Sequence, residues 1–254
     1  MRPGPTNARP LDASYQAVAR ACGLTAVHLI ERADHTGPAD RPGEPSRTAL
    51  HEAIDHQATL LEGRYGAAAR RPVAALWALH RHLLVTGLLL TGPYLLHRRV
   101  PRIHANGITL DPAAASATVT LAGAPGGVET AAHTGELRSI LARHYAPILA
   151  AYGPQVRAGE RSLWGAATDQ IAGGLWHLGR TLNREREATT VATALLPGDT
   201  PPFVGGAAFR QLASLSNAPD DRAAVTRTRV RCCLLYTLSP EDTCATCPRR
   251  RAAG

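Results

Sequence analysis

The chain has 254 residues, of which 28 are basic and 20 acidic, so its net charge is +8. A chain of this length buries a large core without disulfide staples, which excludes the class of small secreted disulfide scaffolds. All of its basic residues are arginine. The positive charge would suit nucleic acid or an acidic protein partner, but an arginine-rich solvated surface explains it equally well.

The amino terminus and the longest apolar stretch bear on the localisation of the protein. Residues 1–5 contain no apolar segment, so we expect no secretory signal. The apolar stretch 73–96 is interrupted by Arg81 and Pro93. Its uninterrupted part, 83–90, is far shorter than a membrane-spanning helix. We therefore expect a cytoplasmic protein with no transmembrane segment, in which this stretch forms a buried helix.

The first part of the chain alternates loose and ordered segments. Residues 1–12 are rich in proline and show no periodicity, so we expect them to be loose. A helix is predicted over 13–20, and the apolar run 27–30 is compatible with a strand or a helix. Residues 34–46 combine prolines, glycines and acids, which indicates a linker or a surface loop.

Helical and strand periods then follow one another. Apolar residues recur at i, i+3 and i+4 over 47–61, which predicts an amphipathic helix. The segment 73–90 is apolar nearly all round, so its helix should be buried. Alternation of apolar and polar residues over 108–110 and again over 117–121 predicts two short strands around a turn.

Two further helices and a boundary complete the pattern. A helix is predicted over 136–152, which Pro147 should kink or divide. Another is predicted over 161–182, weakened at Gly173 and its glycine neighbour. Breaker residues over 196–202 indicate a boundary. The fold class is thus α+β, predominantly helical, with a short β-hairpin.

The domain organisation separates a large body from a small module at the end of the chain. Residues 1–225 should form a helical-rich body in which 1–12 and 34–46 are loose. Residues 226–254 should form a C-terminal module that binds a metal or a cluster, because four of the five cysteines lie there.

These four cysteines are closely spaced. Cys232 and Cys233 are adjacent, and Cys244 and Cys247 follow with two residues between them. Thiolates select zinc, copper(I) or iron–sulfur clusters. A mononuclear zinc site usually takes two pairs of spaced ligands, which the adjacent cysteines do not supply. A [2Fe–2S] cluster takes four cysteines spread over two irons. The spacing leaves a cluster, a zinc ion and a redox disulfide open.

The same residues resemble a known family. The basic residue Arg231 precedes the cysteine pair, Tyr236 follows it, and Pro248 follows the last cysteine. This C-C-x10-C-x2-C ending resembles that of the FhuF-type ferric siderophore reductases. The resemblance is strong over the last thirty residues or so and faint upstream, where the order of the apolar helix, the hairpin, 145–147 and 163–165 is similar. The chain departs from the family in the loop 239–242, which reads Ser-Pro-Glu-Asp where the family often has glycines.

The resemblance implies what the protein binds and does. It implies a [2Fe–2S] cofactor held by Cys232, Cys233, Cys244 and Cys247, which makes the C-terminal module an iron–sulfur module. It implies an oxidoreductase that passes one electron to Fe(III) held by a siderophore, commonly of hydroxamate type, so that Fe(II) is released. No catalytic base is required by this chemistry, and we nominate no catalytic residue. The absence of a dinucleotide-binding glycine motif favours an external ferredoxin or flavodoxin as the electron donor.

Other polar and aromatic residues allow two interpretations. Arg227, Arg229 and Arg231 would favour a reduced anionic cluster and steer an acidic donor. Alternatively, Arg227 and Arg229 would simply line the solvent face of a strand. Trp164 and Trp176 could contact a siderophore, although core packing is the ordinary role of tryptophan. The eleven histidines show no helical zinc pair, and each is read as an ordinary buried or surface side chain.

Two competing functions remain open at this point. A zinc- or cluster-bearing regulator without reductase activity would use the positive charge on DNA, but no arginine-rich recognition helix is apparent, so no nucleic-acid partner is expected. A siderophore-binding or biosynthetic relative would have kept the fold without the electron transfer.

Overall fold

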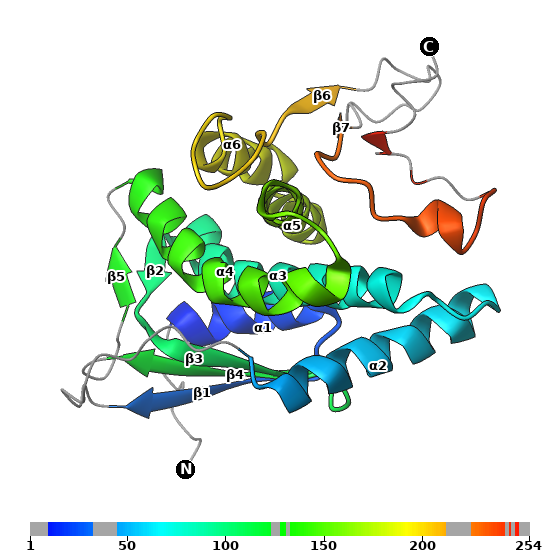
Figure 1. The fold of residues 1–254 in the computed structure, drawn as a ribbon. Helices are drawn as coiled ribbons and strands as arrows, with labels where there is room; N and C mark the ends of the chain where they lie inside the picture. Colours follow the sequence, from blue (N-terminus) through cyan, green and yellow to red (C-terminus); the bar gives the residue numbers. More distant parts are fainter. Residues whose placement is uncertain are drawn as a thin grey trace.

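The computed structural model describes residues 10–32, 45–122, 128–130, 133–211, 225–241, 244 and 247–248. This part of the chain is predominantly helical with short strands, which confirms the predicted fold class (Figure 1). The helices are α1 (Pro10–Cys22), α2 (Arg47–Tyr65), α3 (Arg71–His97), α4 (Thr134–Val156), α5 (Glu160–Thr181) and α6 (Glu185–Leu195). The strands are β1 (Ala26–Arg32), β2 (Arg99–Pro101), β3 (Ile103–Asp111), β4 (Ser116–Ala122), β5 (Val128–Thr130), β6 (Phe209–Gln211) and β7 (Val225–Arg227).

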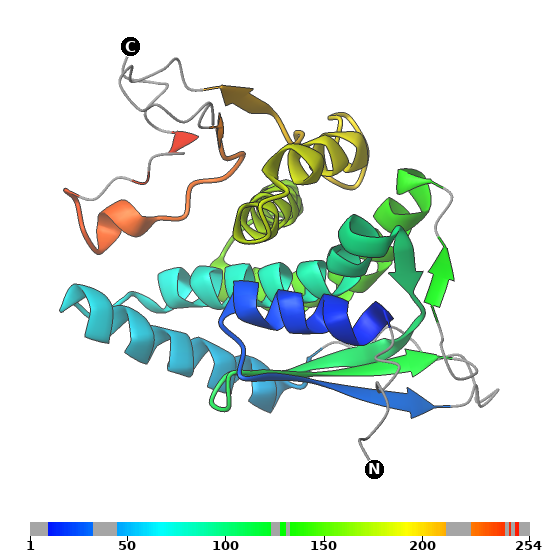
Figure 2. The ribbon, with the colours of Figure 1, turned by 180° about the vertical axis from the view of Figure 1, so that it is seen from behind.

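A three-stranded sheet lies at one end of the molecule. β3 and β4 form the predicted antiparallel hairpin, and β1 pairs with β4 in parallel, which makes 27–30 a strand. Val119 and Leu121 of β4 are buried, in the alternation that the sequence indicated. α1 lies along one face of this sheet, beside α3 (Figures 1 and 2). The parallel partner of the hairpin was not predicted, because its pairing joins segments far apart in the sequence.

The long apolar helix forms the centre of the core. α3 is buried along most of its length, as predicted from its apolar composition. It is long and apolar enough to cross a membrane, but most of its apolar window is buried by the other elements of the fold. Pro93 lies inside its last turns, and the helix ends at Arg98, whose left-handed backbone caps it. This helix therefore carries packing contacts on every side.

Proline and glycine residues that were predicted to disturb two helices lie inside continuous helices. α4 continues through Pro147 as one helix, so of the two expected outcomes, a kink or a division, the division was wrong. The carbonyl that loses its partner belongs to exposed Arg143, where water can satisfy it. α5 likewise continues through Gly173 and Gly174, whose missing side chains allow close packing. A Cβ at Gly174 would press on Leu84 of α3, and one at Gly173 would collide with the guanidinium of Arg227.

Some segments lie outside the predictions or outside the described residues. The expected loose segments fall largely on the undescribed residues 1–9 and 33–44, although residues 10–12 belong to α1 and are helical. Ser46 caps α2, since its Oγ accepts a hydrogen bond from the Ala49 amide at 3.1 Å. α6 was not predicted at all. Its end at Leu195 agrees with the breaker residues that follow.

The C-terminal segment lies at the opposite end of the molecule from the three-stranded sheet (Figures 1 and 2). β6 and β7 pair in an antiparallel ribbon, and a short 3₁₀ turn, Leu235–Thr237, follows the adjacent cysteines. Residues 228–234, between β7 and this turn, run past α5 and the amino-terminal half of α3, where they bond to Asp169 and Trp77. The division of the chain at residue 225 stays a prediction.

Candidate metal centre

The four C-terminal cysteines lie in the segment that runs past α3 and α5. Cys233 and Cys247 are buried, while Cys232 and Cys244 are half-buried. The Sγ atoms of Cys233 and Cys244 are 3.9 Å apart. The amide of Cys247 donates to the carbonyl of Cys244 at 3.0 Å, so these two residues share one tight turn. The structure therefore brings Cys233, Cys244 and Cys247 into one neighbourhood, with Cys232 adjacent in sequence.

The sulfur geometry fits metal ligation. Two thiolates on one tetrahedral metal, with metal–sulfur bonds of about 2.3 Å, lie about 3.8 Å apart. The Cys233–Cys244 distance matches this value. Within the described part of the chain, no three metal-ligating side chains converge as a single ion would require.

Crowding of the sulfurs is unfavourable unless a cation compensates it. Burial, together with the neighbouring thiols of Cys233 and Cys247, raises the pKa of Cys244 to about 11. A coordinating metal cation reverses this effect, because it holds the thiolate form. The cluster of thiols thus has the chemistry of a metal site.

A buried aspartate, missed in the sequence, holds the segment before the cysteines. Asp169 lies in the middle of α5 and is 1% exposed. Its carboxylate accepts hydrogen bonds from the amides of Val230 and Arg231, both at 2.8 Å. It also accepts one from Arg227 Nη1 at 3.0 Å. A single carboxylate therefore fixes the backbone immediately before Cys232.

The alternating arginines are not on a solvent face. Arg227 is 9% exposed, and its Nη2 also donates to the carbonyl of Asp169 at 2.9 Å. Arg229 lies 3.7 Å from the same carboxylate through its Nε. The interpretation of Arg227 and Arg229 as solvent-facing strand residues was therefore wrong. Their charges are directed at Asp169 and the cysteine segment, because the buried carboxylate needs cationic partners.

Trp77 of α3 forms a second attachment. Its indole Nε1 donates to the carbonyl of Cys233 at 2.9 Å. Since α3 is the buried central helix, this hydrogen bond ties the cysteine backbone directly to the core. Nothing local in the sequence marks Trp77 as a long-range donor, so it was not predicted to contribute to the site, unlike Trp164 and Trp176.

Replacing Trp77 by phenylalanine is expected to loosen this attachment while keeping the ring. The unpaired Cys233 carbonyl should cost about 1 kcal/mol or more. We expect faster loss of the bound metal to a chelator, followed by visible absorption. Trp176→Phe is the matched control, because its indole donates to Glu185, away from the cysteines. Equal rates for the two variants would contradict the role of Trp77.

The other two tryptophans divide between core and cavity. Trp164 is buried and packs edge-on against Phe203, with ring centroids 5.3 Å apart, so its expected core role agrees with the structure. Trp176 is half-buried and lines a large cavity. Cys22 is buried in α1, apart from the other cysteines.

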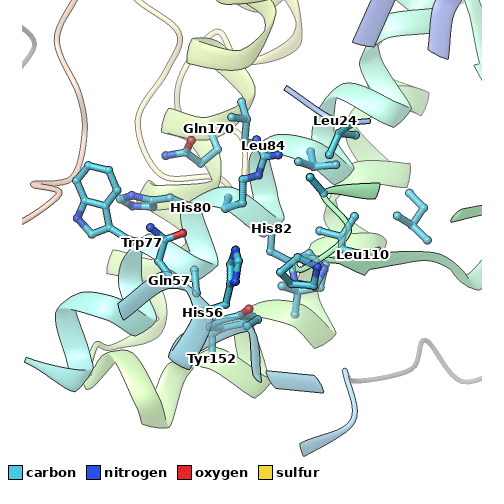
Figure 3. Close-up of a pocket in the computed structure, with 18 of the residues that line it drawn as sticks. Leu24, His56, Gln57, Trp77, His80, His82, Leu84, Leu110, Tyr152 and Gln170 are labelled. Carbon is cyan, nitrogen blue, oxygen red and sulfur yellow. The ribbon is translucent and has the colours of Figure 1, made fainter. Parts of the chain in front are cut away.

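This cavity has a volume of about 1240 Å³ and adjoins the cysteine segment. It is bounded by α2, α3, α4, α5 and the turn of the β3–β4 hairpin, with Arg227 and Arg229 on the side of the cysteines. Figure 3 shows Trp77 and His80 of α3 together at one side, with Gln170 of α5 beside His80 and with Leu110 of the hairpin at the other side. No local pattern predicts this cavity, because its walls combine four helices, the β3–β4 hairpin and the segment before the cysteines.

Several histidines in its wall are neutral. Burial lowers the pKa of His82 to about 3 and that of His144 to about 4. Burial, and then Arg229, Arg231 and Arg227, lower the pKa of His80 well below its usual value. The Nε2 atoms of His80 and His144 are buried without a hydrogen-bond partner among the described residues. These two atoms are thus enclosed by the protein.

Acidification is expected to destabilise the protein through His82 and His144. An unfolded histidine has a pKa of about 6.5, so between about pH 4 and 6.5 the unfolded chain binds more protons than the folded one. Their stabilisation is complete above about pH 6.5 and is lost as the pH falls toward the folded pKa values, by up to about 1.4 kcal/mol per pH unit for each group. Urea unfolding at about pH 7 and pH 5.5 measures this. The His82→Gln/His144→Gln variant should show a shallower dependence, and an unchanged slope would contradict the assignment.

Comparison with known proteins bears on the C-terminal segment. Residues 229–249 match the family model described as the FhuF 2Fe-2S C-terminal domain. All four clustered cysteines lie within the matched residues. No curated protein matches the chain. Residues 229–249 therefore form a FhuF-type domain whose cofactor is a [2Fe–2S] cluster, and the resemblance to the FhuF-type family is confirmed over these residues.

Proposed function

We propose that the protein is a cytoplasmic ferric-siderophore reductase, with Cys232, Cys233, Cys244 and Cys247 as the ligands of its cluster. The observation that carries the proposal is the FhuF-type domain at 229–249, within which Cys233 and Cys244 are at ligation distance. When bound, the cluster supplies one electron, which converts siderophore-bound Fe(III) to Fe(II) as the cluster is oxidised by one electron. A ferredoxin- or flavodoxin-type carrier then restores that electron.

Residues outside the cysteine motif hold the cysteine segment in place and set the charge around it. Asp169 and Trp77 fix the backbone before and at the cysteine pair, so that the ligands are preorganised. The arginines around Asp169 place positive charge beside the thiolates, which favours the reduced, more anionic state. Hydroxamate oxygens hold Fe(III) far better than Fe(II), so reduction alone makes the iron labile. No proton transfer by a side chain is needed.

Single-turnover mixing tests the proposal. Anaerobically reduced protein is mixed with a ferric trihydroxamate in the presence of an Fe(II) trap. We expect the visible band of the chelate to bleach at the rate at which the oxidised-cluster band returns. Mixing with the gallium(III) complex, which accepts no electron, should leave the protein reduced. A reduced cluster that persists beside the intact ferric chelate would exclude the reductase function.

The competing regulator is less well supported by the structure. Arg227 and Arg229 are largely buried against Asp169, so they contribute little to a surface for DNA. Retention of the protein on DNA that weakens steeply with salt would revive that alternative.

A further inference from the structure

We propose that the cavity between α2, α3, α4, α5 and the β3–β4 turn binds the ferric chelate and selects chelates of net negative charge. This rests on the proposed reductase function and adds to it the site and the charge class of the substrate. Its position, size and side chains each support it.

The cavity reaches the cysteine segment. Trp77 lines it and donates to the carbonyl of Cys233, so one side chain contacts both. Arg227 and Arg229, which precede the cysteines, form part of the same wall. One end of the cavity therefore shares its wall with the cysteine segment, so a chelate bound at that end would lie near the cluster ligands.

The cavity is large enough for a whole chelate. Pockets for drug-sized ligands measure about 300–1,000 Å³. This one measures about 1240 Å³. A ferric siderophore is larger than a typical drug, since its ligand wraps the metal on all sides. The volume therefore suits such a complex better than a free iron ion or a small acid.

The charges of the wall are strongly unequal. Among the described residues that line the cavity, five are arginines and one, Asp111, is acidic. Arg227 and Arg229 are compensated by Asp169. The other three are Arg64, Arg81 and Arg180.

These three arginines have no carboxylate partner in the described part of the chain. Arg64 lies against the ring of Tyr65 and Arg180 against that of Trp176, while Arg81 donates to the carbonyl of Cys22. Three cations around a cavity with one carboxylate raise the local concentration of anions and favour their binding. A cationic chelate would meet net repulsion there.

A matched pair of ligands tests the charge selection. A linear trihydroxamate that ends in an amine gives a cationic gallium(III) complex, and its N-succinyl derivative ends in a carboxylate and gives an anionic one. Both carry the same metal centre, and gallium(III) is not reduced. Titration of the holoprotein, followed by the fluorescence of its tryptophans and by calorimetry, should show the anionic complex binding at least about tenfold more tightly.

Variants place the binding in the cavity. Arg64→Gln/Arg180→Gln should remove most of the preference for the anionic complex. Arg143→Gln is the matched control and should keep the preference, because Arg143 is an exposed residue of α4 that does not line the cavity. Ala53→Trp, which fills the cavity from α2, should weaken both complexes, while the visible spectrum of the cluster confirms that the module is intact.

The outcomes separate this inference from the proposed function. Equal affinity for both complexes, or full affinity in Ala53→Trp, overturns the cavity assignment even when the protein reduces ferric chelates. Selective binding that these variants abolish supports it, even when single-turnover mixing shows no reduction and the reductase function fails.

Discussion

Asp169→Asn is expected to lower the free energy of unfolding by about 3–5 kcal/mol, the usual cost of breaking a buried ion pair. The side chain is 1% exposed and compensates Arg227 and Arg229, while also accepting two backbone hydrogen bonds. Asparagine keeps the shape but removes the charge, which leaves buried guanidinium groups without an anion. The segment before Cys232 should then detach from α5, and the cluster should be lost.

Chemical denaturation and visible absorption measure the two effects. Asp55→Asn is the matched control, because Asp55 is 65% exposed and pairs with exposed Arg71 at the surface. That control should change stability by less than about 0.5 kcal/mol. If Asp169→Asn behaves like Asp55→Asn in both measurements, the anchoring role of Asp169 is wrong.

Cys233→Ser and Cys244→Ser are each expected to abolish the cluster or to destabilise it severely. Their sulfurs are 3.9 Å apart, the separation of two thiolates on one metal. A serine hydroxyl is a harder and far less acidic ligand, so it does not replace the thiolate. The purified variants should have lost the visible charge-transfer bands and most of their iron and sulfide.

Cys22→Ala serves as the control for cysteine replacement as such. Cys22 is buried in α1, far from the module in sequence. Its replacement should therefore leave the visible spectrum intact. Far-UV circular dichroism checks that each variant keeps its helices. An undiminished visible spectrum in Cys244→Ser would remove it from the ligand set.

The parts of the fold that depend on local periodicity could be predicted. The helix at 47–61, the buried helix at 73–90 and the hairpin strands have patterns that repeat within a few residues. α6 carried a usable signal that was overlooked, since Ala188, Val191, Ala192 and Leu195 follow the helical period. The expected division at Pro147 failed, because tertiary packing and an exposed carbonyl outweigh a local preference.

The arrangement around the cysteines depends on contacts between distant residues. The spacing of the cysteines is local, and it indicated the C-terminal domain correctly. The partners Asp169 and Arg227 are separated by 58 positions, and Trp77 and Cys233 by 156. A single sequence does not reveal such pairs. One hint was present, because Asp169 lies at helical spacing between Ala166 and Ala172, and a carboxylate on such an apolar face needs a buried partner.

Iron and acid-labile sulfide analysis of freshly purified protein tests the central claim most directly. We expect a reddish-brown protein with about two irons and two sulfides per chain, since a [2Fe–2S] centre has that composition. Reduction should bleach part of the visible absorption and yield a paramagnetic, one-electron-reduced protein. A colourless protein that contains zinc and no sulfide would contradict the cluster and, with it, the proposed reductase.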